Sequence, residues 1–248
     1  MLFLDADLPA GALLDPPAPD PKEVLLSLGA IWYAAPAVHG EPVRALDPIG
    51  NGPVAHPADG NEGGCQVDQY GRTPCLAFTP RVASGFASSD PVDMASFSLA
   101  IIFYAPDGDG KTIAATSASG SRDYRYVSEE GGVITFGLRN DPNAAKVVRS
   151  DISRKPTLVL AHAAGADLRL AIGDAAPVSV RTDAVFQPGP QDLFIGCRRK
   201  RAGLLNSQGA ARVFDVVFLP DTDVFAPGTA PLRDALKARL EEVQENGL

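Results

Sequence analysis

Residues 192–219 read DLFIGCRRKRAGLLNSQGAARVFDVVFL, and this stretch decides the fold. It begins with a short apolar run, DLFIGC, and ends with a longer one, RVFDVVFL. A basic, polar loop that contains glycine separates the two runs. Apolar runs of this length, rich in Val, Ile and Phe and bounded by turn residues, are typical of buried β-strands. We therefore expect the two runs to form neighbouring antiparallel strands of one buried sheet.

Further strand patterns precede this stretch, from about Gln66 onward. FSLAIIFY (Phe97–Tyr104) is a nearly continuous apolar run, which is typical of a strand covered on both faces. In DLRLAI (Asp167–Ile172), large apolar residues alternate with Arg169 and Ala171, which predicts one buried and one solvent-facing side. Such runs recur about every ten residues between turns, as in β-sandwiches. We therefore expect an all-β fold, a two-sheet antiparallel jelly-roll sandwich.

The end of the chain predicts a helix over residues 231–245. Pro231 suits the first turn of a helix, Thr229 is a candidate cap, and Gly247 marks the end. Apolar residues recur every three or four positions and form one narrow stripe: Leu232, Leu236, Leu240 and Val243. We expect this stripe to pack against the outside of the sandwich. Binding of a partner through the same stripe is the alternative.

Residues 1–64 differ in amino-acid composition from residues 65–248, which form the predicted jelly-roll domain. Residues 1–60 hold ten of the 22 prolines, and eight acidic residues against two basic ones. Proline at this density disfavours helix and central strand, so we expect an extended N-terminal arm. Its one apolar patch ends in Trp32 and Tyr33 and is either a short helix or an edge strand. The arm either wraps its own domain, with Trp32 in a groove, or attaches to another protein through these two residues.

The composition excludes several classes of function. A net charge of −8 argues against binding nucleic acid through its phosphates. No apolar run approaches the roughly 20 residues that cross a bilayer, and Asp5 and Asp7 interrupt the start of the chain, so we predict neither membrane insertion nor a signal peptide. Without CxxC spacing, Cys65, Cys75 and Cys197 are expected to be reduced thiols, and a Cys65–Cys75 disulfide would need an oxidising compartment. The chain is predicted to be made in the cytoplasm.

Three groups of segments, in this order, resemble concanavalin A-like lectin and laminin-G-like domains. CLAF followed by FSLAIIFY resembles an early strand pair of that family, TLVLAHAAGADLRLAIGD its central hairpin, and DLFIGC with RVFDVVFL its closing pattern, with Gly196 and Asp215 at matching positions. The likeness covers about Cys75 to Val243. Thr157 replaces the usual Trp and the glycine before the last strand is displaced to Gly209, which indicates a distant relative. The resemblance implies a two-sheet jelly roll that binds glycans or proteins on a concave face or at loop ends, in a family that also includes hydrolases.

Patterns that carry catalysis are missing from the sequence. Glucan hydrolysis needs carboxylates that share one face of a strand, whereas Glu129 and Glu130 are adjacent and face opposite ways. No G-x-S-x-G motif occurs, and His39, His56 and His162 show no metal-ligand spacing. We therefore expect a protein without enzymatic activity.

Two clusters are candidate ligand-binding residues. Four consecutive bases stand out in an acidic protein: Arg198, Arg199, Lys200 and Arg201. They form either a solvated loop or a cradle for an acidic group such as a uronate, because guanidinium groups bind carboxylates through two parallel hydrogen bonds. The second cluster is Tyr124, Arg125 and Tyr126, whose rings either stack on sugars or fill the core.

One pair of loops is a candidate Ca²⁺ site. Asp107 and Asp109 lie in the turn PDGDG and offer carboxylate oxygens, but Ca²⁺ takes six to eight oxygen ligands. Asn140 and Asp141, in the loop RNDPN, would have to join them across the fold. The alternative is a pair of solvated turns, and no other cofactor is expected.

These features lead to a hypothesis about function: a non-catalytic carbohydrate- or cell-surface-binding module. A lectin-like domain after a proline-rich arm resembles spike or fibre adhesion proteins of phages and phage-like particles. The arm would dock on other particle proteins, the jelly roll would bind a cell-surface polysaccharide, and the chain would form a homo-oligomer. The alternatives are a purely structural virion decoration or spike-base protein, and a glycan-active hydrolase.

Overall fold

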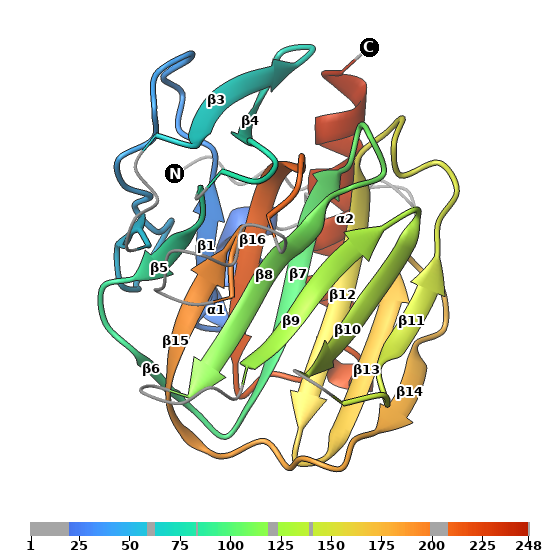
Figure 1. The fold of residues 1–248 in the computed structure, drawn as a ribbon. Helices are drawn as coiled ribbons and strands as arrows, with labels where there is room; N and C mark the ends of the chain where they lie inside the picture. The colour runs from blue at the N-terminus through green and yellow to red at the C-terminus, as the bar shows by residue number, and fades with distance from the viewer. Residues whose placement is uncertain are drawn as a thin grey trace, which may run out of the picture.

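The protein is a sandwich of two antiparallel β-sheets with a helix on the outer side of one of them (Figure 1). The computed structural model describes residues 20–58, 63–82, 84–118, 124–138, 141–198 and 208–247. This architecture confirms the predicted all-β jelly-roll fold with a C-terminal helix. In the described residues, neither helix has the length and apolar character needed to cross a membrane.

Sheet A contains the central strand β16 and has the order β14-β13-β12-β7-β16-β4-β3. Strand β1 pairs with β16 through Ile31 to Ala34, further along β16 than β4. The bounds are β1 Ile31–Ala34, β3 Cys65–Tyr70, β4 Thr73–Phe78, β7 Ser96–Tyr104, β12 Thr157–Ala164, β13 Asp167–Ile172, β14 Val178–Arg181 and β16 Arg212–Pro220.

Sheet B faces sheet A and has the order β11-β10-β9-β8-β15-β5-β2, with β6 also paired to β15. The hairpin turn between β9 and β10 is formed by Gly131 and Gly132, which both adopt positive φ angles. The bounds are β2 Ala55–Pro57, β5 Phe86–Ser88, β6 Val92–Met94, β8 Lys111–Ala118, β9 Tyr124–Glu130, β10 Val133–Leu138, β11 Ala145–Val148 and β15 Gly189–Ile195.

The two runs of the deciding stretch lie in different sheets, so the prediction that they are neighbours in one sheet is wrong. Strand β15 pairs with β8, β5 and β6 in sheet B, whereas β16 pairs with β7, β4 and β1 in sheet A. The segment between them is long enough to cross the roughly 10 Å that separates two packed sheets. Apolar periodicity shows that both runs are buried, but it does not tell which strand each one pairs with.

Two apolar layers hold the sandwich together. The larger layer lies between the sheets and includes Phe97, Phe103 and Phe218. The second lies between the outer face of sheet A and the helices α1 (Pro21–Ser27) and α2 (Ala230–Glu245). In α2, Leu232, Leu236 and Val243 are buried in this second layer, which confirms that the stripe packs on the chain's own sheet. Strand β7 is therefore covered on both faces, as its continuous apolar run predicts.

The described part of the N-terminal segment, residues 20–58, packs on the domain. Both expectations for its apolar patch are realised in turn, because a helix (α1) is followed by a strand (β1). Trp32 and Tyr33 are 7% and 1% exposed. Both predicted attachment residues are therefore buried in the protein's own domain. There, Tyr33 Oη donates a hydrogen bond to the Pro53 carbonyl at 2.5 Å.

A buried carboxylate, Asp215 in β16, connects both ends of the chain. Trp32 Nε1 donates to its Oδ1 at 2.8 Å, and Arg239 Nε of α2 donates to its Oδ2 at 3.0 Å. A β-bulge between Val213 and Asp215 places Asp215 on the helix side of the sheet. Burial raises the pKa of Asp215, while the charge of Arg239 and the indole N–H act in the opposite direction.

The three cysteines have buried, free thiols. Cys65 faces the layer between the sheets, whereas Cys75 faces the layer under the helices. The two strands pair Cys65 with Phe78 rather than with Cys75, so the thiols lie on opposite faces and form no disulfide. Burial, aided by the nearby charge of Asp68, raises the pKa of Cys75 to about 12 and keeps this thiol protonated at neutral pH.

We predict that Asp215→Asn lowers the free energy of unfolding by about 1.5–3 kcal/mol, because the buried hydrogen bond between Arg239 and a charged carboxylate is lost and Arg239 keeps only its more exposed partner Glu242. Urea denaturation followed by fluorescence measures the change. The matched control is Asp174→Asn. It removes a mostly exposed ionic partner of Lys237, which lies on α2 like Arg239, and should lower the free energy of unfolding by less than about 1 kcal/mol. Equal losses for the two variants would contradict the role assigned to Asp215.

Candidate functional site

The part of sheet A that α2 leaves uncovered carries a row of polar side chains. Ser98 of β7, His162 of β12, Arg169 of β13 and Ser179 of β14 are cross-strand neighbours in one continuous row. Because side chains alternate between the two faces of a strand, residues paired directly across strands share a face. The row therefore lies on the outer face, opposite the leucines of β13 that enter the core.

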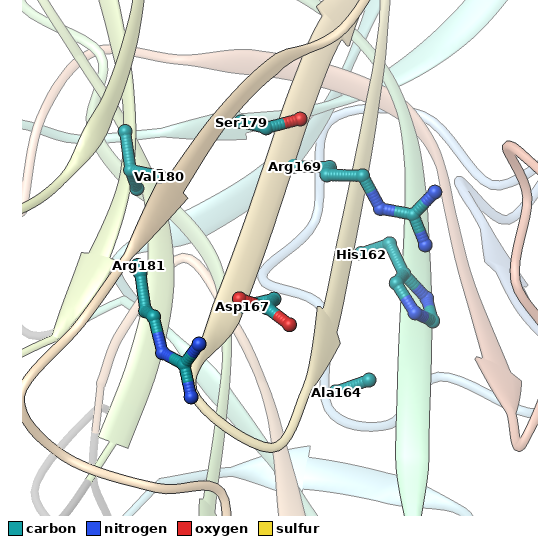
Figure 2. Close-up of a pocket in the computed structure, with 7 residues that line it drawn as sticks. All are labelled: His162, Ala164, Asp167, Arg169, Ser179, Val180 and Arg181. Atoms are coloured by element: carbon teal, nitrogen blue, oxygen red, sulfur yellow. The ribbon is translucent and has the colours of Figure 1, made fainter.

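A second row runs beside the first and completes a pocket. Ala164, Asp167 and Arg181 are cross-strand neighbours at the ends of β12, β13 and β14. The two rows line a pocket of about 500 Å³, which we call the sheet A pocket. In Figure 2, Asp167 lies between Arg181 and His162. The lining consists of His162, Ala164, Asp167, Arg169, Ser179, Val180 and Arg181.

The loop that leads from β16 to α2 supports one side of the pocket. Its Asp223 accepts a hydrogen bond from the Arg169 guanidinium at 2.6 Å, and Arg169 lies over the ring of Phe225. Partial burial acts to raise the pKa of Asp223, but the hydrogen bonds from Arg169 and from the Phe225 backbone N–H hold it below its ordinary value. Arg169 is thus fixed in place by an ionised carboxylate.

His162 is a buried residue of the pocket lining, and its hydrogen bonds define its tautomer. Ser98 Oγ donates to the Thr222 carbonyl at 2.6 Å, accepts from Val224 N, and lies 3.0 Å from His162 Nδ1. A hydroxyl has one hydrogen, and that of Ser98 is used toward Thr222. His162 Nδ1 must therefore carry a hydrogen and be the donor of the hydrogen bond to Ser98 Oγ. Burial lowers the pKa of His162; the carboxylate of Asp223 opposes this and Arg169 adds to it.

Ser98, His162 and Asp223 do not form a nucleophilic triad. Such a triad needs the serine and the carboxylate on opposite nitrogens of the imidazole. Here Asp223 Oδ1 lies 4.0 Å from Nδ1, the same nitrogen that contacts Ser98. Ser98 is also fully buried and has already donated its hydrogen. The arrangement can bind and orient a polar ligand, but it contains no activated nucleophile.

Three of the predicted ligand-binding residues meet on the outer face of sheet B. The guanidinium of Arg198 lies 3.6 Å from the ring centroid of Tyr126 and 5.8 Å from that of Tyr124. Arg198 Nε also donates to Thr112 Oγ1 at 2.6 Å. Arg198 thus covers one face of the Tyr126 ring, and a sugar could stack there only by displacing it.

The other predicted ligand-binding residues are not part of that cluster as the structure describes it. Arg125 is a buried residue that points between the sheets, where its guanidinium lies 4.7 Å from the centroid of the Phe186 ring. Arg199, Lys200 and Arg201 lie outside the described residues. Of the four bases of the predicted cradle, the structure therefore describes Arg198 only.

The predicted Ca²⁺ ligands do not come together. The loop of Asp107 and Asp109 lies beside the β9–β10 turn, where Gly131 N donates to the Gly108 carbonyl. Asp141 follows the other end of β10, a six-residue strand that spans roughly 20 Å. Asp109 pairs with Lys111 at 2.9 Å, and Asn140 lies outside the described residues. Within the described ranges, no group of three or more His, Cys, Asp or Glu side chains is placed to hold a metal ion.

Sequence reasoning missed the sheet A pocket. The alternation predicts that Arg169 lies on a solvent-facing side, which the structure confirms, but no pattern in the sequence assigns His162 or Asp223 to a ligand site. The alternation in DLRLAI was the one signal that pointed to this face. Its partners on β7, β12 and β14 follow only from the strand register.

Comparison with known proteins supports the fold. No protein-family model and no curated protein sequence matches the chain. Among solved structures, Trypanosoma rangeli sialidase with 2,3-difluorosialic acid superimposes with a TM-score of 0.57 at 14% identity, over 85% of this chain and 33% of the sialidase. The same sialidase with sialic acid gives 0.55 at 12% identity, over 90% and 37%. The mouse laminin α1 chain, domains LG4-5, gives 0.41 at 14% identity, over 68% and 46%, which is too low to carry an argument.

This chain spans about a third of the length of the sialidases that it resembles. At 12–14% identity, the likeness shows a shared fold and nothing about activity. The function must therefore be argued from the residues of this chain.

We predict that folding stability falls between pH 7 and pH 5.5 through His162. Its pKa in the folded state lies below 6.5, so the unfolded state takes up the proton first as the pH falls. The free energy of unfolding should decrease by up to about 1.4 kcal/mol per pH unit in this window. Urea denaturation at several pH values should show a flatter profile for His162→Gln. The exposed control, His39→Gln, should keep the wild-type profile, and identical profiles for all three proteins would contradict the prediction.

Proposed function

We propose that this chain is a non-catalytic carbohydrate-binding module and that the sheet A pocket is its binding site. The observation that carries the proposal is the pocket itself, in which donors and acceptors from three adjacent strands line about 500 Å³ on the uncovered part of a sheet. This volume is in the range of small-molecule sites, roughly 300–1,000 Å³. Sugar hydroxyls both donate and accept hydrogen bonds, so a site for them needs both kinds of partner.

The chemistry of the lining fits recognition. Asp167 offers acceptors and Ser179 offers a donor and an acceptor, and both are exposed on neighbouring strands. Arg169 is rigid because Asp223 holds it, so a ligand that contacts it loses little side-chain entropy on binding. These properties favour a preformed site on a rigid sheet.

The absence of catalysis is part of the proposal and rests on the lining. Hydrolysis of a glycosidic bond generally uses two carboxyl groups on opposite sides of the bond. In the described lining of the sheet A pocket, Asp167 is the carboxylate, and the nearby Asp223 is engaged by Arg169. A reducing-sugar release assay on any glycan that binds tests this directly, and release above background would overturn it.

The setting on a phage-like particle stays a prediction from the sequence. It supposes that the chain is attached to other particle proteins and that several copies act together on a polysaccharide. Trp32 and Tyr33 are buried in the domain, so attachment through the N-terminal part would have to use other residues of that part. Sedimentation velocity at increasing concentration tests the homo-oligomer, and a monomer at every concentration would argue against this setting.

We predict that Asp167→Ala lowers the affinity for a bound glycan by about tenfold or more, because a hydrogen bond to a charged group contributes about 1.5–3 kcal/mol. A glycan array identifies the ligand, and titration calorimetry measures the change. The matched control is Asp93→Ala, an exposed aspartate of β6 in sheet B that should leave affinity unchanged. Equal affinities of both variants and the wild type would rule out the sheet A pocket.

A further inference from the structure

We infer that the sheet A pocket selects a carboxylated saccharide, with Arg181 binding the carboxylate and Asp167 accepting a hydrogen bond from a hydroxyl of the same sugar. This inference rests on the proposed function and specifies the class of ligand. It concerns the uronic-acid type of sugar, in which a planar carboxylate is attached to the ring.

The first support is the charge of the pocket lining. The lining holds two guanidinium groups, Arg169 and Arg181, and one carboxylate, Asp167. Asp223 compensates the charge of Arg169, so Arg181 is the positive charge that remains for a ligand. The whole chain carries a net charge of −8. Because the overall field of a negative protein repels anions, the attraction of an anionic group has to come from Arg181 at short range.

The second support is that Arg181 is exposed and has no ionic partner among the residues that the structure describes. No described carboxylate oxygen lies within 4.0 Å of its guanidinium nitrogens. Arg169, in contrast, is engaged by Asp223 at 2.6 Å. A guanidinium group presents parallel N–H donors that match the two oxygens of a carboxylate, so Arg181 is the group best suited to bind one.

The third support is the position of Asp167. Asp167 and Arg181 are direct cross-strand neighbours, and such residues have Cβ atoms about 4.5–5.5 Å apart. In Figure 2 the two side chains lie next to each other on neighbouring strands. One sugar residue can therefore contact both: its carboxylate at Arg181 and a hydroxyl hydrogen at Asp167.

Another pocket of the molecule lacks this combination. A pocket of about 450 Å³ lies between β3, β4 and the start of β16, and it also contains an arginine, Arg212. Its guanidinium is already paired with Asp68 at 3.2 Å. An anion would have to compete with that carboxylate, which makes the sheet A pocket the better anion site.

The test uses the full chain and three acidic oligosaccharides: oligogalacturonate, oligomers of hyaluronan and oligomers of alginate. Each is compared with its carboxyl-reduced, neutral counterpart by titration calorimetry at low salt. We expect at least one acidic oligomer to bind tenfold or more tightly than its neutral counterpart. Arg181→Gln should remove this preference, whereas Arg154→Gln, an exposed arginine in the turn before β12, should keep it.

The outcomes separate this inference from the proposed function. If the wild type binds acidic and reduced oligomers equally, the carboxylate inference is overturned and carbohydrate binding stands. If Arg181→Gln keeps the preference for the acidic form, the assignment of Arg181 is overturned. If neither these oligomers nor any member of a broad glycan array binds, the proposed function fails as well. Unchanged melting temperatures for both variants would show that the comparison concerns binding and not folding.

Discussion

The fold depends on one buried carboxylate in the central strand of sheet A. Asp215 accepts hydrogen bonds from Trp32 near the start of the described chain and from Arg239 near its end, and it is 2% exposed. A carboxylate at this depth is tolerated only when its charge and both oxygens are satisfied. The residues that satisfy it therefore fix where the N-terminal strand and the C-terminal helix dock. Helix α2 packs on the outer face of sheet A through its apolar stripe, and the contact of Arg239 with Asp215 fixes its position there.

The position of α2 in turn decides which part of the sheet stays open. Under the helix, the outward residues of β7 and β12 are apolar, among them Ala100, Ile102 and Leu160. Beyond the helix, the outward residues of the same strands are Ser98 and His162. Along each strand, the outward residues thus change from apolar to polar at the point where α2 no longer covers the sheet. The loop that carries Asp223 lies at this point and contacts Arg169. The candidate site is the polar part of the outer face of sheet A, whose apolar part is buried under the helices.

Much of the fold could be predicted from the sequence, because strand alternation and helical periodicity are local. The nearly continuous run in β7, the turn at Gly131 and Gly132, and the stripe of α2 each need only a window of residues. The partners of β15 and β16 could not be predicted, since two equally apolar runs give no information on which sheet each joins. The pocket has the same limitation: Ser98, His162, Arg169 and Ser179 are separated along the chain, and only the register of four strands places them in one row.

The two candidate faces differ in whether their arginine side chains already contact other protein groups. On sheet B, the most suggestive residues in the sequence, Arg198 and Tyr126, contact each other, so the ring face that a sugar would use is occupied. On sheet A, Asp223 immobilises Arg169 but leaves Arg181 without an ionic partner in the described part of the chain. A ligand gains most where a rigid frame surrounds a charge that is not yet compensated, because it then displaces no protein contact. By this criterion the sheet A pocket is the better candidate for the proposed binding site, although the sequence alone draws little attention to its residues.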